Sequence, residues 1–563
     1  MGFIDTNGVN GHTNGTNGTN GVNGHHLSAH ISADEFTKQD FDYVICGGGT
    51  AGLTIAARLT EDPNVKVGVI EAGKLRLDDP LVDIPTAFLQ MLGNPDYDWM
   101  YKTVPQGANK DKIHHIPRGK LVGGSSGINY MMYVRGSLQD YDDWAELSGD
   151  PSWGSKEMSH YMRRRAPCTE GFVRTGFNDN SLPIEDIVIQ AADEVCGLSK
   201  KPTDPWSGDH IGFFNTMGSI ARTGPNRGKR SYAARGAFEA NSHRPNLKLV
   251  SESTVARVVL ENKRATGVEF INNGQKHTVK ANREVIICGG VFGSPQILEL
   301  SGVGDPKVLE AAGVECLVDL PSVGTDFQDH QIIIVGHQLK EGQMSGDSIY
   351  KPQIMEMAQK AYAETQGGPL SNISAIQGFF PVKPLLEPGE LDEFERLIKE
   401  TKVESDFQRK QLDQVLRQVK SDTSANLQFV LIPASGNPNG VDDQSKLFPP
   451  PKEGSPDGIT LCVCVQYGAS RGRIHIKSSD PFEHPTIDPG YISHPADHIL
   501  LSAALDSKLR VKGVQGLRVA DASAFANNVS GNIVSSVYAI AEKAADIIKA
   551  DHASSGKLGK VAA

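Results

Sequence analysis

The chain has 563 residues, of which 22% are charged and 39% are hydrophobic, and its formal net charge is −11. This length and composition are typical of a globular protein with a large core and more than one domain. No block of Lys and Arg and no apolar stretch of membrane-spanning length occurs, which argues against nucleic acid as a partner and against a transmembrane segment. We therefore expect a small-molecule substrate, and nothing in the composition indicates an oligomeric state.

Residues 1–36 are predicted to form a disordered tail. Residues 7–26 repeat Asn-Gly-Thr and Asn-Gly-Val units, which carry too few apolar side chains to bury a core. The chain start lacks the positively charged and apolar regions of a secretory signal, so a cytoplasmic location is expected. The residues from Gly2 to Thr6 fit only the loose N-myristoylation pattern, and a single acyl chain anchors a protein weakly.

The first chemical motif is a glycine-rich turn between a strand and a helix. Residues 42–46 form a short apolar run, and the next six residues satisfy G-x-G-x-x-G with Gly47, Gly49 and Gly52. Gly47 permits a tight turn, Gly49 lets the backbone approach a pyrophosphate, and Gly52 lets helix and strand pack closely. The N–H groups at the helix start, assigned to Thr50 and Ala51, attract phosphate together with the positive end of the helix dipole. This unit predicts dinucleotide binding.

A carboxylate follows the second predicted strand, residues 65–70. This is Glu71, about 20 residues beyond Gly52, with Ala72 next to it. A carboxylate at that spacing accepts hydrogen bonds from a ribose, and it completes the order strand, loop, helix, strand, acid. Because both FAD and NAD carry a ribose, Glu71 does not distinguish between them.

The next segment does indicate the cofactor. Residues 117–136 read PRGKLVGGSSGINYMMYVRG, which resembles the first signature of the GMC (glucose–methanol–choline) family of FAD-dependent oxidoreductases. Small residues there let backbone amides close on a flat ring, and the Asn129 side chain can both donate and accept a hydrogen bond. The resemblance implies FAD as cofactor. The residues that it places against the flavin are Val122, Ser125, Asn129, Tyr130, Met131 and Met132.

Further stretches agree with this resemblance, which runs from about residue 41 to 550. Residues 286–304 are similar to the second family signature, and residues 323–330 resemble the family's VGxxxQDH turn. The resemblance places Val255 on the adenine, and it brings Asp521 and Ala522 to the cofactor from the far end of the sequence. It also implies that the C-terminal helix, with Asn532 and Ile533 at its start, points its positive dipole end at the flavin.

The predicted fold class is α/β, with a doubly wound, Rossmann-like FAD-binding domain and an α+β substrate domain built on a mostly antiparallel sheet. Both domains are discontinuous. The FAD-binding domain is expected to comprise residues 40–155, 225–330 and 507–550, and the substrate-binding domain residues 156–224 and 331–506. The seven cysteines have no metal-ligand spacing, so no metal site is predicted.

One departure from the family pattern bears on catalysis. Members oxidise alcohols by passing a hydride to the flavin, while a His takes the hydroxyl proton and a second His or Asn orients the substrate. The second position matches Asn532, which is the catalytic residue we assign. The first His is missing, because residues 497–505 stand where relatives carry a long helical segment that includes it. His494 and His498 lie nearby in sequence but in a turn-like context, and neither is assigned a catalytic role.

The leading hypothesis is FAD-dependent oxidation of an alcohol group on a small metabolite, with secondary metabolism as the expected setting and with oxidase and dehydrogenase both open. Three explanations of the missing His compete: another group serves as base, the protein is catalytically impaired, or the sequence comes from an incorrect gene model. Two alternatives to the leading hypothesis remain. They are a non-redox cyclase or dehydratase on the same fold, and a flavin-binding protein without efficient catalysis.

Overall fold

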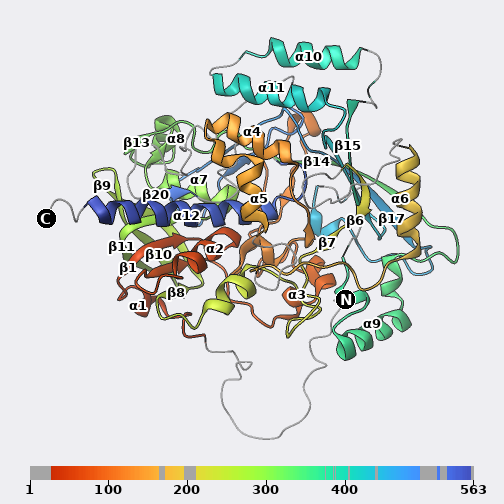
Figure 1. Cartoon of the computed structure of the whole chain (residues 1–563), viewed down its shortest axis with the longest axis horizontal. Helices are drawn as coiled ribbons and strands as arrows, with labels where there is room; N and C mark the ends of the chain where they lie inside the picture. The colour runs from red at the N-terminus through yellow and green to blue at the C-terminus, as the bar shows by residue number, and fades with distance from the viewer. Residues whose placement is uncertain are drawn as a thin grey trace, which may run out of the picture.

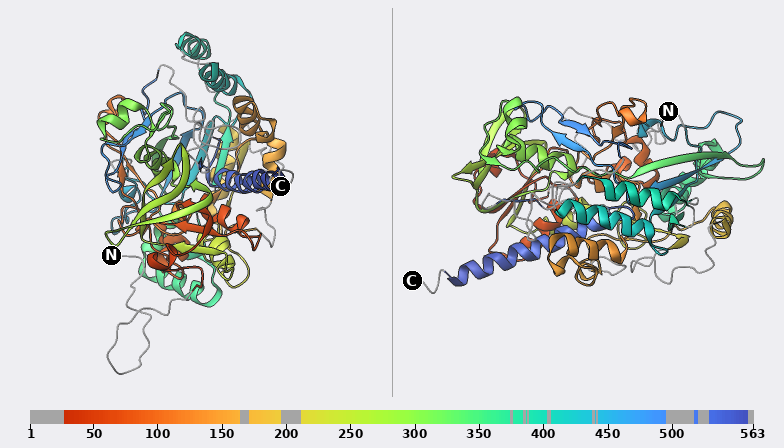
Figure 2. Two further views of the ribbon diagram at one scale, coloured as in Figure 1. Left: turned by 90° about the vertical axis from the view of Figure 1, so that its left-hand side faces the viewer. Right: turned by 90° about the horizontal axis from the view of Figure 1, so that it is seen from above.

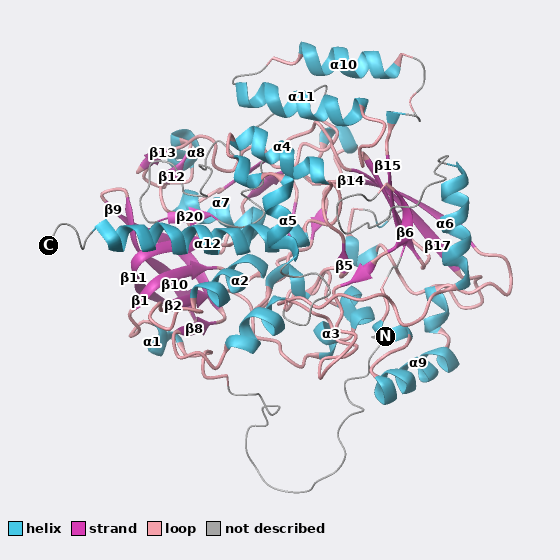
Figure 3. Cartoon of the chain, in the orientation of Figure 1, coloured by secondary structure: helices cyan, strands magenta, loops and turns pink. Residues whose placement is uncertain are grey.

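The computed structural model describes residues 27–163, 171–195, 211–373, 376–383, 386, 389–402, 406–437, 440, 442–494, 517–519 and 529–558. Two large sheets organise this part of the chain, one largely parallel and one antiparallel. They lie on opposite sides of the view in Figure 1, and Figure 3 shows helices packed around both.

The larger sheet has seven strands in the order β8-β2-β1-β11-β10-β9, with β20 paired to β11 outside this path. Its strands are β1 (Phe41–Cys46), β2 (Val67–Ile70), β8 (Leu247–Val250), β9 (Ser253–Glu261), β10 (Arg264–Asn272), β11 (Gln275–Ile287) and β20 (Leu517–Val519). Strands β8, β2, β1, β11 and β20 pair in parallel, whereas β10 pairs antiparallel with β9 and β11. The 13-residue β11 joins the two parts, because its first half pairs with β10 and its second half with β1 and β20.

Helices cover both faces of this sheet. Tyr43 and Ile45 of β1 belong to a core cluster with α2 (Thr50–Leu59) and α12 (Val534–Leu558), while Val44 and Cys46 belong to another cluster with α7 (Gly290–Leu300). Because successive strand residues point to opposite faces, this alternation places helices on both sides of β1. Helix α12 packs along α2 and projects from the body at its C-terminal end (Figure 2).

The smaller sheet has the order β14-β17-β16-β15-β6, and every neighbouring pair is antiparallel. Its strands are β6 (Gly212–Asn215), β14 (Gln331–Gln338), β15 (Ile376–Phe380), β16 (Leu427–Ile432) and β17 (Gly458–Val465). Its two faces differ. On β16, Phe429 and Leu431 pack in a cluster with α6 (Pro183–Val195), whereas Val430 and Ile432 face the interior cavity described below.

Short elements complete the fold. The remaining helices are α1 (Ala33–Phe36), α3 (Pro80–Asp83), α4 (Leu138–Ser148), α5 (Ser155–Arg163), α8 (Pro306–Ala311), α9 (Pro352–Thr365), α10 (Glu390–Glu400) and α11 (Asp406–Lys420). Two-stranded sheets pair β3 (Tyr101–Lys102) with β4 (His115–Ile116), β5 (Met132–Tyr133) with β7 (Met217–Gly218), β12 (Val303–Gly304) with β13 (Val318–Asp319), and β18 (Arg473–His475) with β19 (Thr486–Asp488). No helix among the described residues combines the length and the low polarity that crossing a membrane requires.

The predicted fold class is confirmed. The larger sheet is built entirely from segments expected in the FAD-binding domain, and the smaller sheet from segments expected in the substrate-binding domain. The exact domain boundaries stay a prediction.

The predicted tail is too long at its C-terminal end. Residues 1–26 lie outside the described residues, but residues 27–36 are part of the fold. The Leu249 N–H donates to the Ala29 carbonyl at 2.7 Å, and the Ile31 N–H donates to the Leu249 carbonyl at 3.0 Å, so this segment extends the parallel sheet beyond β8. Phe36 is fully buried, and its ring centroid lies 4.7 Å from that of Phe41. The polar repeats end at residue 26, and the prediction wrongly extended the disorder expected of them to residues 27–36, which include the buried Phe36.

Two N-terminal deletions should therefore differ. Removing residues 1–36 should lower the melting temperature by several degrees, because it exposes the surface that Phe36 covers and removing a buried Phe costs about 3–5 kcal/mol. Removing residues 1–26 should leave the melting temperature almost unchanged, since the repeats have little apolar surface. Thermal unfolding of the two truncated proteins measures this, and equal melting temperatures would contradict the anchoring role of residues 27–36.

Candidate functional site

Residues from both sheets line one cavity of about 620 Å³. It lies at the carboxyl ends of β1 and β2, where Cys46 and Ile70 are the last strand residues, and this edge of a parallel sheet is where ligands bind. On the other side, Ile334, Val430 and Cys462 of the antiparallel sheet face inward. The sequence-predicted residues that line the cavity are Gly47, Gly49, Thr50, Ala51, Glu71, Ala72, Ser125, Asn129, Tyr130, Met131, Met132, Val255, Asn532 and Ile533.

Four predicted residues fall elsewhere. Asp521 and Ala522 lie outside the described residues. Gly52 and Val122 are not in the lining. Val122 is fully buried in the core, and its N–H donates to the Lys74 carbonyl at 3.0 Å, so it supports the site from behind instead of facing it.

The three glycines of the first motif differ in what surrounds them. Gly47 has a φ of +111°, and a Cβ there would lie 2.2 Å from the Cys288 carbonyl oxygen. A Cβ at Gly52 would lie 2.0 Å from the Gly47 carbonyl oxygen, so both positions exclude any side chain. At Gly49 the nearest atom to a Cβ is Gly124 Cα, 3.7 Å away, which is an ordinary contact. Because Gly49 also lines the cavity, a side chain there would compete chiefly with a ligand.

Helix α2 presents an anion-binding end to the cavity. Gly49 is its N-cap, and no side chain caps the helix. The first N–H groups of a helix have no partner within the helix, and the dipole adds positive potential. Since Thr50 and Ala51 line the cavity, these N–H groups are placed to receive a phosphate.

Glu71 is held by backbone donors on both of its oxygens. Gly48 N–H donates to Oε2 and Gly73 N–H donates to Oε1, each at 2.8 Å. Burial raises the pKa of Glu71 to about 7, although these backbone hydrogen bonds oppose the shift. The carboxyl group therefore has a structural role in shaping the loop in addition to its position in the cavity.

A buried arginine fixes the segment around Asn129. Arg230 Nη1 donates to both the carbonyl oxygen and Oδ1 of Asn129 at 2.8 Å, and its Nε donates to the Val82 carbonyl at 3.0 Å. Met131, which follows closely, has a φ of +59°, a strained conformation for a residue with a side chain. Its N–H donates to Asn129 Oδ1 at 3.1 Å. Asn129 Oδ1 thus accepts hydrogen bonds from within the protein, from Arg230 and from the Met131 N–H.

The start of α12 brings Asn532 into the cavity. Asn532 Oδ1 accepts hydrogen bonds from Gln377 Nε2 at 3.3 Å and from Gln428 Nε2 at 3.2 Å. Asn532 Nδ2 has no hydrogen-bond partner among the described residues. Gly531, just before it, has a φ of +112°, which lets the chain turn into the helix.

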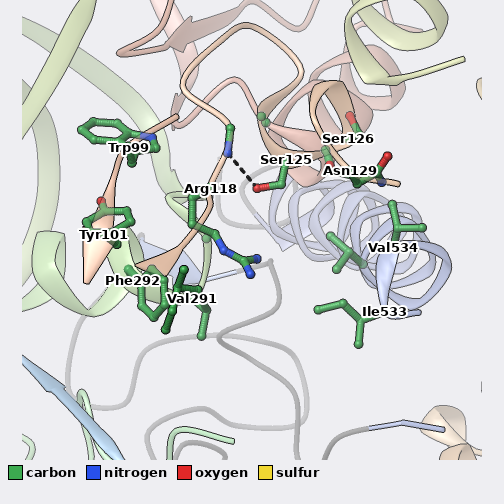
Figure 4. Close-up of a pocket in the computed structure, with 18 of the residues that line it drawn as sticks. Trp99, Tyr101, Arg118, Ser125, Ser126, Asn129, Val291, Phe292, Ile533 and Val534 are labelled. Atoms are coloured by element: carbon green, nitrogen blue, oxygen red, sulfur yellow. Dashed lines mark hydrogen bonds between the residues drawn. The ribbon is translucent and has the colours of Figure 1, made fainter. Parts of the chain in front are cut away.

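Arg118 and His330 are among the cavity residues that the sequence analysis did not assign. Arg118 extends its guanidinium between Ser125 and the pair Val291 and Phe292 (Figure 4), and this guanidinium makes no hydrogen bond or ion pair with a described residue. His330 also lines the cavity. Both stand in motifs quoted above, but nothing in a linear motif tells that these side chains point inward.

His330 lies beside the segment that leads into α12. Its Nε2 atom is buried and has no hydrogen-bond partner among the described residues, while the nearby Val529 backbone acts to raise its pKa. Burial has the larger effect, and it lowers the pKa of His330 below its usual value. His494, by contrast, is half-buried and does not line the cavity, and His498 lies outside the described residues.

A parallel sheet with this glycine turn, an uncapped helix end and an acid directly after the next strand is typical of dinucleotide-binding proteins. The chain belongs to the GMC oxidoreductase family. The family's N-terminal model matches residues 41–332 and its C-terminal model matches residues 500–541.

The chain is similar to named relatives over nearly its whole length. It is 36% identical to the dehydrogenase citC of Monascus ruber, over 93% of this chain and 98% of that one. It is 29% identical to an oxygen-dependent choline dehydrogenase of Stenotrophomonas maltophilia, over 91% of this chain and 95% of that one. An FAD-dependent oxidoreductase from Chaetomium thermophilum has the same fold, with a TM-score of 0.77 and 24% identity over 91% of this chain and 100% of that one.

FAD is therefore the cofactor, and the residues present fit it. The uncapped start of α2 matches the negative charge of a pyrophosphate, and Arg118, whose guanidinium lies 5.8 Å from the Phe292 ring centroid, adds positive charge to the cavity. The space beside Gly49 leaves room for a close approach, and the cavity continues past the Asn129 segment to the start of α12. A long dinucleotide with a flat ring at one end suits a site of this form.

Replacing Glu71 by Gln should destabilise the cofactor-free protein by about 1–3 kcal/mol, because the NH₂ group of the amide must face one of two backbone N–H donors. The folded-state pKa of about 7 lies above the ordinary value of 4.5, so the proton-linked stability from Glu71 is present below pH 4.5 and is lost as the pH rises to 7. The Gln variant has no group that titrates at this position, so it does not lose stability in this way. The difference in unfolding free energy between parent and variant should therefore shrink between pH 5 and pH 8. Denaturant unfolding at both pH values tests this, with exposed Glu310→Gln as the control; a deficit independent of pH would contradict it.

Proposed function

We propose that FAD occupies this cavity and that the chain oxidises an alcohol group on a small metabolite. In this proposal, Gly49, Thr50 and Ala51 hold the pyrophosphate, and Arg118 adds positive charge there. Glu71 and Ala72 bind the ribose, and Val255 packs on the adenine. The residues proposed to contact the flavin ring or its approach are Ser125, Asn129, Tyr130, Met131, Met132, Asp521, Ala522, Asn532 and Ile533.

The observation that carries the proposed activity is that Asn532 and His330 line the same cavity as the Asn129 segment. Bound FAD supplies a two-electron acceptor for the hydride that leaves the alcohol carbon. Asn532 can hold the alcohol oxygen but cannot take its proton, because a neutral amide is no base. A neutral imidazole can, and the lowered pKa of His330 keeps that ring neutral at pH 7.

We propose His330 as the group that takes the hydroxyl proton in this chain. Its Nε2 is buried, so Nδ1 is the ring nitrogen left for a ligand, with the neutral ring carrying its hydrogen on Nε2. The oxidation then balances: the hydroxyl proton passes to Nδ1, the hydride leaves the carbon, and a carbonyl product remains. The ring lies beside Val529, three positions before Asn532, which places both groups at the start of α12.

We also propose that this chain lacks the segment in which family members carry their catalytic His. The alignment with the Monascus ruber dehydrogenase runs over 613 positions although the chain has 563 residues, so it includes positions that this chain lacks. This supports a shortened segment but does not locate it. The relatives' names support a dehydrogenase or an oxygen-dependent enzyme, and a setting in secondary metabolism remains our proposal.

Gly49→Val should abolish FAD binding while leaving the fold intact. The nearest protein atom to a Cβ at Gly49 is 3.7 Å away, so the cost falls on the pyrophosphate and not on the core. The purified variant should be colourless and should stay so with excess FAD, while its circular dichroism matches that of the parent. Gly52→Val is the contrast, because its Cβ would collide with backbone and the protein should fail to fold. A yellow Gly49→Val protein would contradict this placement of FAD.

His330→Asn should slow flavin reduction by an alcohol by about 10²–10⁴, which is the usual contribution of a positioned base, while FAD stays bound. In the parent, kcat/KM should rise with pH and level off, with the midpoint of the rise below 6.5, because burial lowers the pKa of His330 from that value. The variant should lose that rise. Anaerobic stopped-flow absorbance measures both, and His494→Asn, a half-buried histidine outside the cavity, is the matched control.

The same assay separates the alternatives. If His330→Asn reduces its flavin as fast as the parent, the assignment of the base is wrong. If insertion before Leu505 of the corresponding segment from the Monascus ruber dehydrogenase raises the rate by about 10²–10⁴, the family His was needed and His330 is a poor substitute. Product formation from an alcohol without flavin bleaching would instead indicate a non-redox enzyme.

A further inference from the structure

Three buried glutamines connect the antiparallel sheet to the start of α12. Gln377 lies on β15, Gln428 on β16, and Gln466 directly follows β17. Their residues are 0%, 3% and 1% exposed, so their amide groups must find partners within the protein. They form one hydrogen-bonded chain that ends on Asn532.

The direction of this chain is set by backbone groups at one end. The Gly531 N–H, which can only donate, bonds Gln466 Oε1 at 2.6 Å. The Cys464 carbonyl, which can only accept, receives Gln466 Nε2 at 3.2 Å. Both contacts require the same orientation of the Gln466 amide, which removes the usual ambiguity between its oxygen and nitrogen.

The orientation then passes from one amide to the next. Gln466 Nε2 donates to Gln428 Oε1 at 3.4 Å, which leaves Gln428 Nε2 to donate to Gln377 Oε1 at 3.0 Å and to Asn532 Oδ1 at 3.2 Å. Gln377 Nε2 completes the chain by donating to the same Asn532 oxygen at 3.3 Å. Asn532 Oδ1 therefore accepts two hydrogen bonds from the protein. The two hydrogens of Asn532 Nδ2 have no partner among the described residues.

We infer that Gln377, Gln428 and Gln466 are positioning residues that lock Asn532 as a pure hydrogen-bond donor to the cavity. This rests on the function proposed above and deepens it. The ligand group at Asn532 must then be an oxygen that accepts, such as that of an alcohol, a carbonyl or a carboxylate. An ammonium group at this point would face N–H groups with no acceptor. Ile334, Val430 and Ile432 lie on the same wall, so the body of the ligand is apolar.

Gln428→Glu tests the lock at a pH high enough to ionise the introduced, buried carboxyl group, because an ionised carboxylate cannot donate to the Asn532 oxygen. Asn532 should then turn its NH₂ group toward the introduced carboxylate and present its oxygen to the cavity. Benzoate should bind the FAD-loaded parent and bind the variant at least about 10-fold more weakly, whereas benzylammonium should gain affinity. Titration by the change in flavin absorbance gives both dissociation constants without turnover. Gln414→Glu, which places the same change in a buried glutamine of α11 outside the cavity, should leave both constants unchanged.

The outcomes are distinct. Unchanged benzoate and benzylammonium constants in a folded Gln428→Glu protein overturn the lock. If that variant does not fold, Gln428→Met takes its place, because it removes both hydrogen bonds that Gln428 donates. The affinity for benzoate should then fall, with no gain in affinity for benzylammonium. Unchanged benzoate binding by Gln428→Met also overturns the lock. A parent that is reduced by an alcohol but prefers benzylammonium overturns the donor role alone. A parent that neither binds benzoate nor is reduced by any alcohol overturns the proposed function as well.

Discussion

The turn from β1 into α2 brings backbone groups closer together than any side chain allows. A Cβ on Gly47 would lie 2.2 Å from the Cys288 carbonyl oxygen, and one on Gly52 would lie 2.0 Å from the Gly47 carbonyl oxygen. This packing sets where α2 begins and how it lies on the sheet. Helix α12 packs along α2, so the place of Asn532 at the start of α12 depends on the same contact. One glycine turn thus positions both the N-terminus of α2 and Asn532 on the cavity.

The sequence predicted the parts of the site that rest on local signals. The glycine turn, Glu71 and the Asn129 segment could be read from contiguous residues whose spacing has a direct physical meaning. It missed Arg118 and His330, because a linear motif does not tell which way a side chain points. It missed the glutamine network, because its members come from different strands and a single glutamine in a strand carries no signal of its own. Phe36 was missed for a related reason: its partners Phe41 and Phe270 make it an anchor, and its neighbours do not. At Val122 the side chain lies in the core and not in the cavity lining, because a motif position does not say which face its side chain takes.

The two sheets contribute different kinds of groups to the cavity lining. The parallel sheet contributes backbone groups and small residues, which suit a cofactor that does not vary. The antiparallel sheet contributes inward side chains at every second position of β14, β16 and β17, such as Ile334, Val430 and Cys462. Because these side chains can change without disturbing the glycine turn, a change of substrate in this fold requires little alteration of the cofactor end.

The glutamine network has one further property, which follows from the chemistry of its groups. Primary amides neither gain nor lose a proton over the pH range in which proteins stay folded. A relay built from three of them keeps the same donor and acceptor pattern in acid and in base, unlike a relay of carboxylates or imidazoles. The donor pattern that the network sets on Asn532 is in this sense insulated from pH, whereas His330, which lines the same cavity, gains charge in acid.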